Sequence, residues 1–291
     1  MTYDVVVLGA GLAGLTCALR LADEGARVAI AATGVGAVQL AGGTVDVLGY
    51  APEPVACPAT ALPGFAAAHP DHPYARMDVA TIAAALDWYR KRVGELAYVG
   101  SLEENLLLPT AVGVAKPTAL APRSMIAGDV RAGGRFALVG LRELKDFYAP
   151  LAADNMQRGS GRSAFAVELE VRADEADVTP VGWARRFDDP GWRRAVVRDL
   201  SARVEGADAI GFPAVLGFYD HPTAWRELQE GLGAPVFEVP TLPPSVPGLR
   251  LLRALKSELR YARARLMVGS PATGAHAERG RARSVTVRSA A

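Results

Sequence analysis

The residues best suited to chemistry are three glycines near the start of the 291-residue chain. They have Gly-x-Gly-x-x-Gly spacing and lie between an apolar run, 4–8, and a helical stretch, 15–23. In a strand–turn–helix unit, Gly9 permits a tight turn, Gly11 lets a pyrophosphate approach the backbone, and Gly14 lets the helix pack closely on the strand. The pattern predicts a dinucleotide-binding turn.

The start of the helix supplies the other half of such a site. Leu12 and Ala13 stand at its first turn, where backbone N–H groups have no partner within the helix. These donors and the positive end of the helix dipole favour a phosphate. The alternative is a glycine-rich turn without a ligand, but the flanking strand and helix favour nucleotide binding.

A ribose-binding carboxylate is missing from its usual place. A dinucleotide fold has an Asp or Glu about 20 residues past the glycines, at the end of the second strand. This chain has Thr33 there, and no acidic residue occurs between Glu24 and Asp46. Either Thr33 and backbone groups replace the carboxylate, or the cofactor is bound weakly, is a mononucleotide flavin, or is absent.

Two later segments carry further candidate contacts. Gly42, Gly43 and Thr44 follow the second strand and either lie beside the cofactor phosphates or form an ordinary loop. A proline-rich loop then opens a predicted helix, 249–266. Within it, Arg250 either binds a phosphate or carboxylate or lies on the surface.

The sequence assigns no catalytic acid or base, and Asp46 and His72 are only candidates. His69 and His72 each precede a proline, so the backbone there is extended and the two imidazoles need not converge on a metal. The two cysteines form no C-x-x-C pair. We therefore expect no metal or iron–sulfur ligation by this chain.

Composition excludes several classes of function. The net charge is +1, so bulk electrostatics indicate no nucleic-acid partner. The chain has no run of 18 or more apolar residues, so no membrane-spanning segment is predicted. The low cysteine count suits a reducing cytoplasm.

Strands that alternate with helices predict an α/β protein. We expect a Rossmann-type FAD/NAD(P)-binding domain, residues 1–50 and 206–268, with an inserted α/β domain, 51–205. The arginine-rich end, 269–291, has few large aliphatic side chains and is expected to be a disordered tail. The main expected helices are 79–92, 141–148, 191–204 and 223–230, and the main expected strands are 135–140, 164–171, 209–217 and 235–240.

Several segments resemble the B subunit of the anaerobic glycerol-3-phosphate dehydrogenase. They are the opening motif, 4–15, then 42–48 and 72–74, and finally 241–251. The last begins Thr-Leu-Pro-Pro-Ser and is the most particular, whereas the first is common to many flavoproteins. The likeness covers about residues 1–268.

The resemblance implies a polypeptide that holds FAD or FMN within a larger enzyme. This enzyme oxidises sn-glycerol 3-phosphate to dihydroxyacetone phosphate and passes electrons to quinones. The implied partners are a catalytic flavoprotein, which is the A subunit of the complex, and an iron–sulfur protein, which is its C subunit. The iron–sulfur protein ties the complex to the cytoplasmic face of the cell membrane, so a cytoplasmic, peripheral location is expected.

The chain departs from the family at its C-terminal end. Family members continue with a further strand, glycine-rich turn and helix that cover the flavin. We therefore expect a C-terminally truncated chain or a frameshift product, with weak flavin retention and an unpaired strand edge. The alternatives are another FAD-dependent oxidoreductase of the fumarate reductase or amine oxidase kind, and a non-catalytic protein that stabilises the catalytic flavoprotein.

Overall fold

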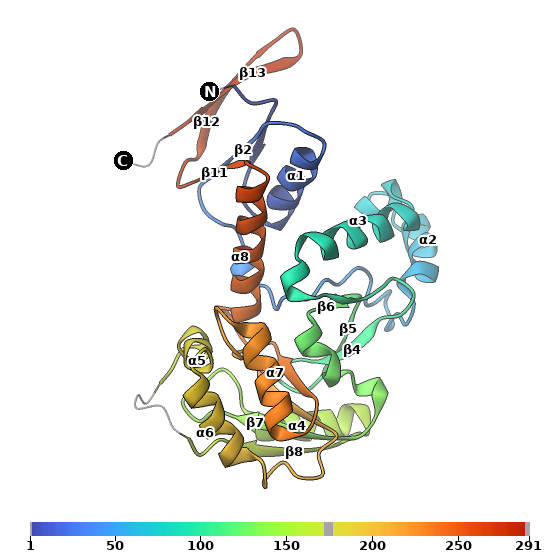
Figure 1. Cartoon of the computed structure of the whole chain (residues 1–291). Coiled ribbons are helices and arrows are strands. Elements are labelled where there is room, and N and C mark those ends of the chain that lie inside the picture. Colours follow the sequence, from blue (N-terminus) through green and yellow to red (C-terminus); the bar gives the residue numbers. More distant parts are fainter. Residues whose placement is uncertain (1, 172–176, 289–291) are drawn as a thin grey trace. The chain divides into compact units, whose positions relative to one another are not determined.

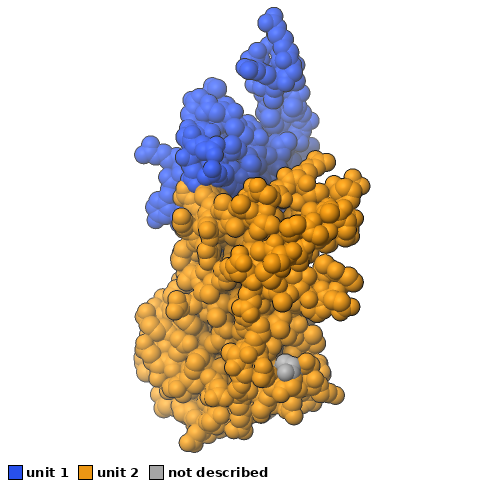
Figure 2. Space-filling model, turned by 90° about the vertical axis from the view of Figure 1, so that its right-hand side faces the viewer, with its two compact units in different colours: residues 1–41, 248–291 blue, residues 42–247 orange. Residues whose placement is uncertain are grey.

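The computed structural model describes residues 2–171 and 177–288. The chain forms two compact units, which Figure 2 shows in different colours. Unit 1 comprises residues 1–41 and 248–291, and unit 2 comprises residues 42–247. The α/β class expected from the sequence is confirmed, because both units contain parallel sheets connected through helices.

The boundaries between the units differ from those expected. The sequence suggested a return to the first domain at about residue 206, whereas the structure returns at residue 248. The reason is strand pairing. Strands β9 (Ala209–Pro213) and β10 (Val236–Val239) extend the parallel sheet of unit 2, so the segment that contains them belongs to that unit.

Unit 1 is built on a three-stranded parallel sheet in the order β1-β2-β11, of which Figure 1 labels β2 and β11. Its elements are β1 (Val5–Leu8), α1 (Leu12–Asp23), β2 (Val28–Ala32), η1 (Val38–Leu40) and β11 (Arg265–Val268). β2 is buried along its whole length, whereas Leu8 of β1 is 61% exposed. Among the described residues β1 pairs only with β2, so the expected unpaired strand edge is present.

Helix α8 (Val246–Tyr261) leads into β11. Leu251, Leu255 and Leu259 repeat every four residues and are buried, which gives the helix its apolar stripe. The helix ends five residues earlier than its predicted end at 266. Arg263 adopts a left-handed backbone with φ of 55°, and the chain then becomes the strand β11.

A β-hairpin occupies most of the segment for which we expected disorder. It consists of β12 (Ala272–Glu278) and β13 (Arg281–Val287), which pair antiparallel. Arg279 and Gly280 both have positive φ, at 51° and 76°, as a tight two-residue hairpin turn requires. The turn and the backbone ladder make the hairpin without the large apolar side chains whose scarcity suggested disorder. Residues 289–291 of the expected tail lie outside the described residues.

Unit 2 contains a four-stranded parallel sheet in the order β10-β9-β7-β8. Its other strands are β7 (Arg135–Gly140) and β8 (Ser163–Glu168), and its connecting helices are α4 (Ala149–Ser160), α5 (Pro180–Phe187), α6 (Pro190–Leu200) and α7 (His221–Leu232). The general rule that such crossovers are right-handed predicts α4 on one face of the sheet and α5–α7 on the other. Accordingly α4 contacts β7 and β8, whereas α6 contacts α7.

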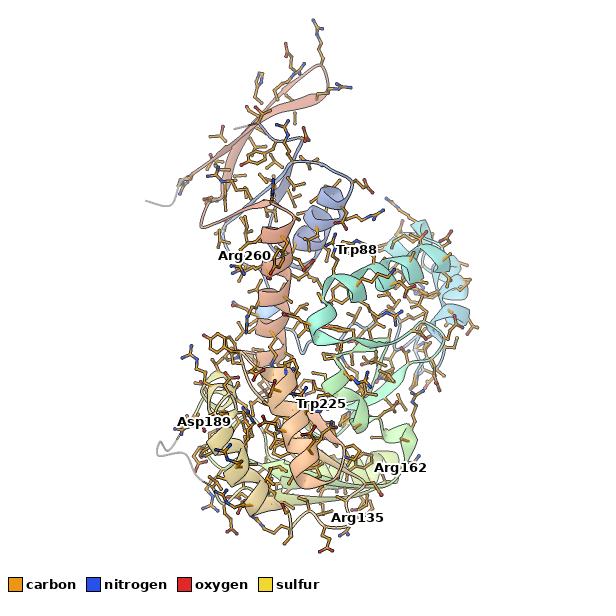
Figure 3. All side chains as sticks on the ribbon, viewed as in Figure 1. Trp88, Arg135, Arg162, Asp189, Trp225 and Arg260 are labelled. Carbon is orange, nitrogen blue, oxygen red and sulfur yellow. The ribbon has the colours of Figure 1, made fainter. Side chains whose placement is uncertain are left out.

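The core of unit 2 follows from this layering. Phe136 and Phe237 meet edge to face, and Phe187 of α5 meets Phe212 of β9 in the same way. Trp225 of α7, labelled in Figure 3, donates from Nε1 to the carbonyl of Val236 at 2.7 Å and ties the helix to β10.

The helix expected over residues 141–148 is absent, and the helix that follows it, α4, was not expected. Residues 141–148 form a loop between β7 and α4, although Leu141, Leu144 and Phe147 have helical spacing and are buried. The helix begins instead at Ala149, where Pro150 occupies the first turn. Proline is tolerated there because its missing N–H would be unpaired anyway.

The rest of unit 2 consists of two helices and short strands. They are α2 (Pro58–Ala68), α3 (Val79–Arg92), β3 (Val99–Gly100) paired with β6 (Leu120–Ala121), and β4 (Leu106–Pro109) paired with β5 (Ala115–Thr118). Short 3₁₀ segments are η2 (Pro73–Arg76), η3 (Gly94–Leu96), η4 (Arg123–Gly128) and η5 (Val130–Ala132). α3 has the bounds predicted from sequence. Within residues 2–171 and 177–288, no helix combines the length and apolar content that a membrane crossing needs.

Candidate functional site

The glycine turn of unit 1 has the geometry expected for a dinucleotide site. Gly9 has φ of 105°, and its N–H donates to the carbonyl of Ala31 at 2.8 Å. A β-carbon on Gly14 would clash with the carbonyl oxygen of Gly9, whereas one on Gly11 would meet no atom within 4 Å. The turn is therefore closed beneath Gly14 and open above Gly11, which is where a pyrophosphate would approach.

Helix α1 presents uncapped N–H groups at this turn. Its N-cap is Gly11, which offers no side-chain hydrogen bond, and its first turn contains no acidic residue. Leu12 and Ala13 are exposed. The turn can therefore direct free backbone donors at a phosphate. These features of the chain fit the pyrophosphate of a dinucleotide.

Thr33 directly follows β2 and is exposed. A β-carbon on Gly36 would lie 2.7 Å from Cα of Gly11, so the segment after β2 runs against the glycine turn. The Thr33 hydroxyl thus stands at the carboxyl end of the second strand, where other dinucleotide folds place an acidic residue.

Gly42, Gly43 and Thr44 belong to unit 2, whereas the glycine turn belongs to unit 1. The structure holds this segment firmly within unit 2. Lys116 Nζ donates to Thr44 Oγ1 at 3.2 Å and to Asp46 Oδ2 at 2.5 Å.

The side chains that the sequence offers for catalysis and substrate binding are paired or buried within the fold. Asp46 forms an ion pair with Lys116, and the His72 side chain accepts the N–H of Tyr74 at 3.2 Å. Arg250 is 5% exposed on α8. Among the described residues, no three His, Cys, Asp or Glu side chains gather in a way that could hold a metal ion.

A buried polar cluster in unit 2 was not expected from the sequence. Glu238 of β10 is 1% exposed, and its carboxylate accepts hydrogen bonds from Ser124 Oγ at 2.8 Å and from the N–H of Leu216 at 3.0 Å. His221 Nε2 lies 2.8 Å from the same carboxylate. The only signal in the sequence was an acidic residue within an apolar strand.

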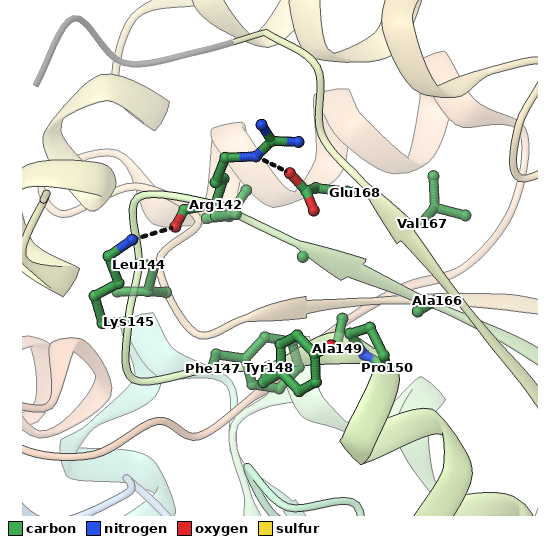
Figure 4. A pocket seen from close by; sticks show the side chains of 12 residues that line it. Arg142, Leu144, Lys145, Phe147, Tyr148, Ala149, Pro150, Ala166, Val167 and Glu168 are labelled. Carbon is green, nitrogen blue, oxygen red and sulfur yellow. Dashed lines mark hydrogen bonds and ion pairs between the residues drawn. The ribbon is translucent and has the colours of Figure 1, made fainter. Parts of the chain in front are cut away.

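Unit 2 also contains a cavity of about 400 Å³ at the carboxyl ends of β7 and β8 (Figure 4). Arg142 and Glu168 form an ion pair on one side of it, and Phe147, Tyr148 and Pro150 lie on the other. Lys145 Nζ donates to the carbonyl of Arg142 at 3.2 Å. None of the site residues predicted from the sequence lines this cavity.

Comparison with known proteins identifies the cofactor. A family described as FAD binding domain matches residues 4–287, which includes the glycine turn and reaches the end of the hairpin. The cofactor is FAD, one of the two flavins expected from the sequence.

A crystal structure of 3-ketosteroid delta1-dehydrogenase from Sterolibacterium denitrificans, in complex with 1,4-androstadiene-3,17-dione, aligns with a TM-score of 0.41 at 17% identity. The alignment covers 99% of this chain and 44% of that one.

Curated relatives show the narrower family. The B subunit of the anaerobic glycerol-3-phosphate dehydrogenase of Pectobacterium carotovorum subsp. carotovorum is 36% identical, over 94% of this chain and 68% of that protein. The probable B subunit of the same enzyme of Halobacterium salinarum is 35% identical, over 98% of this chain and 69% of that protein. The chain thus spans about two thirds of the length of these relatives. It belongs to the FAD-binding family and, within it, to the family formed by the B subunits of anaerobic glycerol-3-phosphate dehydrogenases.

Proposed function

We propose that this chain is the flavin-binding subunit of an anaerobic, quinone-linked glycerol-3-phosphate dehydrogenase. The enzyme would oxidise sn-glycerol 3-phosphate to dihydroxyacetone phosphate. The observation that carries the proposal is the glycine turn, open above Gly11 at the uncapped start of α1, in a chain of this FAD-binding family.

FAD, when bound, supplies the capacity to accept hydride equivalents and release electrons. The work of the chain is to bind and orient it. The N–H groups of Leu12 and Ala13 would hold the pyrophosphate, and the Thr33 hydroxyl would offer a hydrogen bond to the ribose. Gly42, Gly43 and Thr44 remain the predicted contacts in unit 2. Arg250 remains the candidate for the substrate phosphate, although its burial means that a ligand would have to reach it inside the fold.

The proposed assembly follows the names of the relatives, which denote one subunit of a larger enzyme. We propose two partners, a catalytic flavoprotein (the A subunit) and an iron–sulfur protein (the C subunit). The complex would lie on the cytoplasmic face of the cell membrane and be attached through the iron–sulfur protein. The proposal predicts that this chain reaches membrane fractions only when its partners are present.

A second candidate function is a non-catalytic protein that stabilises the catalytic flavoprotein. The observation that favours it is β1, whose outer edge pairs with nothing among the described residues and whose Leu8 is exposed. Such an edge is suited to pairing with another chain. A different FAD-dependent oxidoreductase, of the fumarate reductase or amine oxidase kind, is the third possibility.

FAD titration and substrate turnover distinguish these functions. The purified chain is titrated with FAD beside Gly11→Val, whose branched side chain would fill the space above the turn. We expect the variant to lose FAD binding. The chain is then coexpressed with the catalytic flavoprotein and assayed with sn-glycerol 3-phosphate and an artificial electron acceptor. Full activity of a complex that contains Gly11→Val would favour the structural role, and turnover of another donor instead would favour a different oxidoreductase.

A further inference from the structure

Four backbone carbonyls within residues 43–48 accept hydrogen bonds from other parts of unit 2. Their partners come from widely separated parts of unit 2. The Tyr98 hydroxyl donates to Gly43 O, the Ala119 and Leu120 N–H groups to Val45 O at 3.1 and 3.0 Å, the Tyr74 hydroxyl to Val47 O at 2.6 Å, and Asn105 Nδ2 to Leu48 O at 2.9 Å. The segment therefore has little freedom to move.

The N–H groups at the start of the same segment, by contrast, are not held by hydrogen bonds among the described residues. Those of Gly42, Gly43 and Thr44 donate to no acceptor in residues 2–171 and 177–288. Gly43 is buried, and buried N–H groups without a partner are rare in folded proteins. Three successive free donors beside fixed carbonyls indicate a place for acceptor atoms of a ligand.

The conformation of Gly43 depends on two neighbours. Its φ is 88°, a value that L side chains rarely adopt, and a β-carbon there would lie 2.7 Å from Cβ of Pro247. The Tyr98 hydroxyl grips the Gly43 carbonyl and so fixes the peptide that carries the Thr44 N–H. Pro247 therefore closes one side of this turn, and Tyr98 sets the direction of the Gly43 carbonyl.

The surroundings of Tyr98 keep its hydroxyl available as a hydrogen-bond donor. It is 6% exposed, and its ring meets that of Tyr89 edge to face with centroids 5.3 Å apart. Burial raises the pKa of Tyr98 well above its usual value, so its hydroxyl stays protonated and able to donate. Lys116, by comparison, holds only the side chains of Thr44 and Asp46 and is partly exposed.

We propose that Tyr98 is a positioning residue for FAD. It holds the peptide between Gly43 and Thr44 so that the Thr44 N–H, next to the free N–H groups of Gly42 and Gly43, faces acceptor atoms of the flavin cofactor. The inference rests on the proposed flavin-binding function and adds to it a residue outside every sequence motif. The donors are backbone groups, so their orientation depends on what holds the backbone.

The test compares two tyrosines that grip the same segment four residues apart. Tyr98→Phe removes the hydroxyl that binds Gly43 O, and Tyr74→Phe removes the one that binds Val47 O. FAD affinity is measured for each full-length variant by quenching of flavin fluorescence, with a thermal melt without FAD as the measure of stability. We expect Tyr98→Phe to weaken FAD binding by about tenfold, the largest effect typical of one neutral hydrogen bond, and Tyr74→Phe to leave it unchanged.

The visible absorption spectrum of bound flavin supplies a second measurement. A changed band shape in Tyr98→Phe, with riboflavin affinity reduced as much as FAD affinity, would mean that the donors face the isoalloxazine ring. Reduced FAD affinity with unchanged riboflavin affinity would mean that they face a phosphate. Either result supports the inference.

The negative outcomes are distinct. If the unmodified chain binds no FAD, the proposed function fails. If it binds FAD and Tyr98→Phe binds it equally well with the same spectrum, the positioning role is wrong while the function stands. Equal weakening by both variants, in step with equal loss of thermal stability, would also overturn the role, since both would then act only through the fold.

Discussion

The carbonyl oxygen of Gly9 occupies the space that a β-carbon on Gly14 would need. Gly11, three residues earlier, has open space in the corresponding direction. Two glycines of one motif therefore have separable tasks, since Gly14 serves packing, whereas the open space at Gly11 leaves room for the proposed ligand.

The first prediction follows from this difference. Gly14→Ala should lower the free energy of unfolding by about 1–3 kcal/mol, the usual cost of overpacking. Gly11→Ala should change it by no more than about 0.5 kcal/mol, since its methyl group meets nothing. Denaturant unfolding checks both values, and FAD titration should show the larger effect for Gly11→Ala. An unstable Gly11→Ala protein would contradict the assignment.

The second prediction concerns the buried Glu238 cluster. Glu238→Ala leaves the donors on Ser124, His221 and Leu216 without their acceptor and should cost about 3 kcal/mol or more. Ser124→Ala removes a single donor and should cost about 1 kcal/mol. Urea melts of the two variants give the comparison, and equal losses would show that the carboxylate does not hold the cluster together.

The third prediction concerns two adjacent aspartates. The Asp188 carboxylate accepts the N–H groups of Phe218, Tyr219 and Asp220 at 2.9–3.1 Å. Asp189, labelled in Figure 3, is the N-cap of α6, and within residues 2–171 and 177–288 its carboxylate accepts only the N–H of Trp192, at 2.7 Å. Asp188→Ala should therefore cost about 2–3 kcal/mol and Asp189→Ala about 1 kcal/mol. Thermal melts of both proteins test the order, and the reverse order would be inconsistent with these contacts.

The fourth prediction is a loss of stability at alkaline pH. Burial raises the pKa of Tyr89 from 10.0 to about 12, and it raises that of Tyr98 well above the usual value. Above pH 10 the unfolded chain releases these protons while the folded chain retains them, so stability should be full below pH 10 and fall towards pH 12. Denaturant melts across this range, with tyrosinate absorbance recorded in parallel, provide the check. In Tyr89→Phe the fall should be shallower.

The fifth prediction concerns the hairpin of unit 1. Both of its strands are largely exposed, and an isolated two-stranded hairpin is only marginally stable in water. Trypsin should therefore cut first near Arg279, Arg281 and Arg283 and leave a core that ends near residue 268. A chain that resists trypsin there as well as in unit 2 would mean that the hairpin is packed in solution.

Local patterns were readable from the sequence. The glycine turn and α3 could be predicted because neighbouring residues determine them: glycine spacing for the turn, and apolar spacing after an Asp cap for the helix. The side chain of that cap, Asp78, accepts the N–H of Thr81 at 2.7 Å. Such contacts span only a few residues.

The missed features depend on residues far apart in the chain. Glu238 meets Ser124 across 114 positions, and β9 joins the sheet beside β7 although β8 lies between them in sequence. For residues 141–148 a local pattern was misleading, because it predicted a helix where the structure has a loop. The leucines and the phenylalanine of this loop have helical spacing, but they reach the core from a loop. Pro150 marks the start of the observed helix, α4. The hairpin was missed because its backbone pairing needs no apolar side chains.

The ends of the inserted segment have a consequence for how this protein could arise and be rearranged. Gly43 packs against Pro247 at the two ends of unit 2, and in unit 1 a β-carbon on Gly248 would lie 2.7 Å from the carbonyl oxygen of Ala41. Each unit therefore closes on itself at the point of insertion. A short linker could therefore replace unit 2 within unit 1. The adjacent ends of unit 2 would permit its circular permutation or its transfer into another host protein.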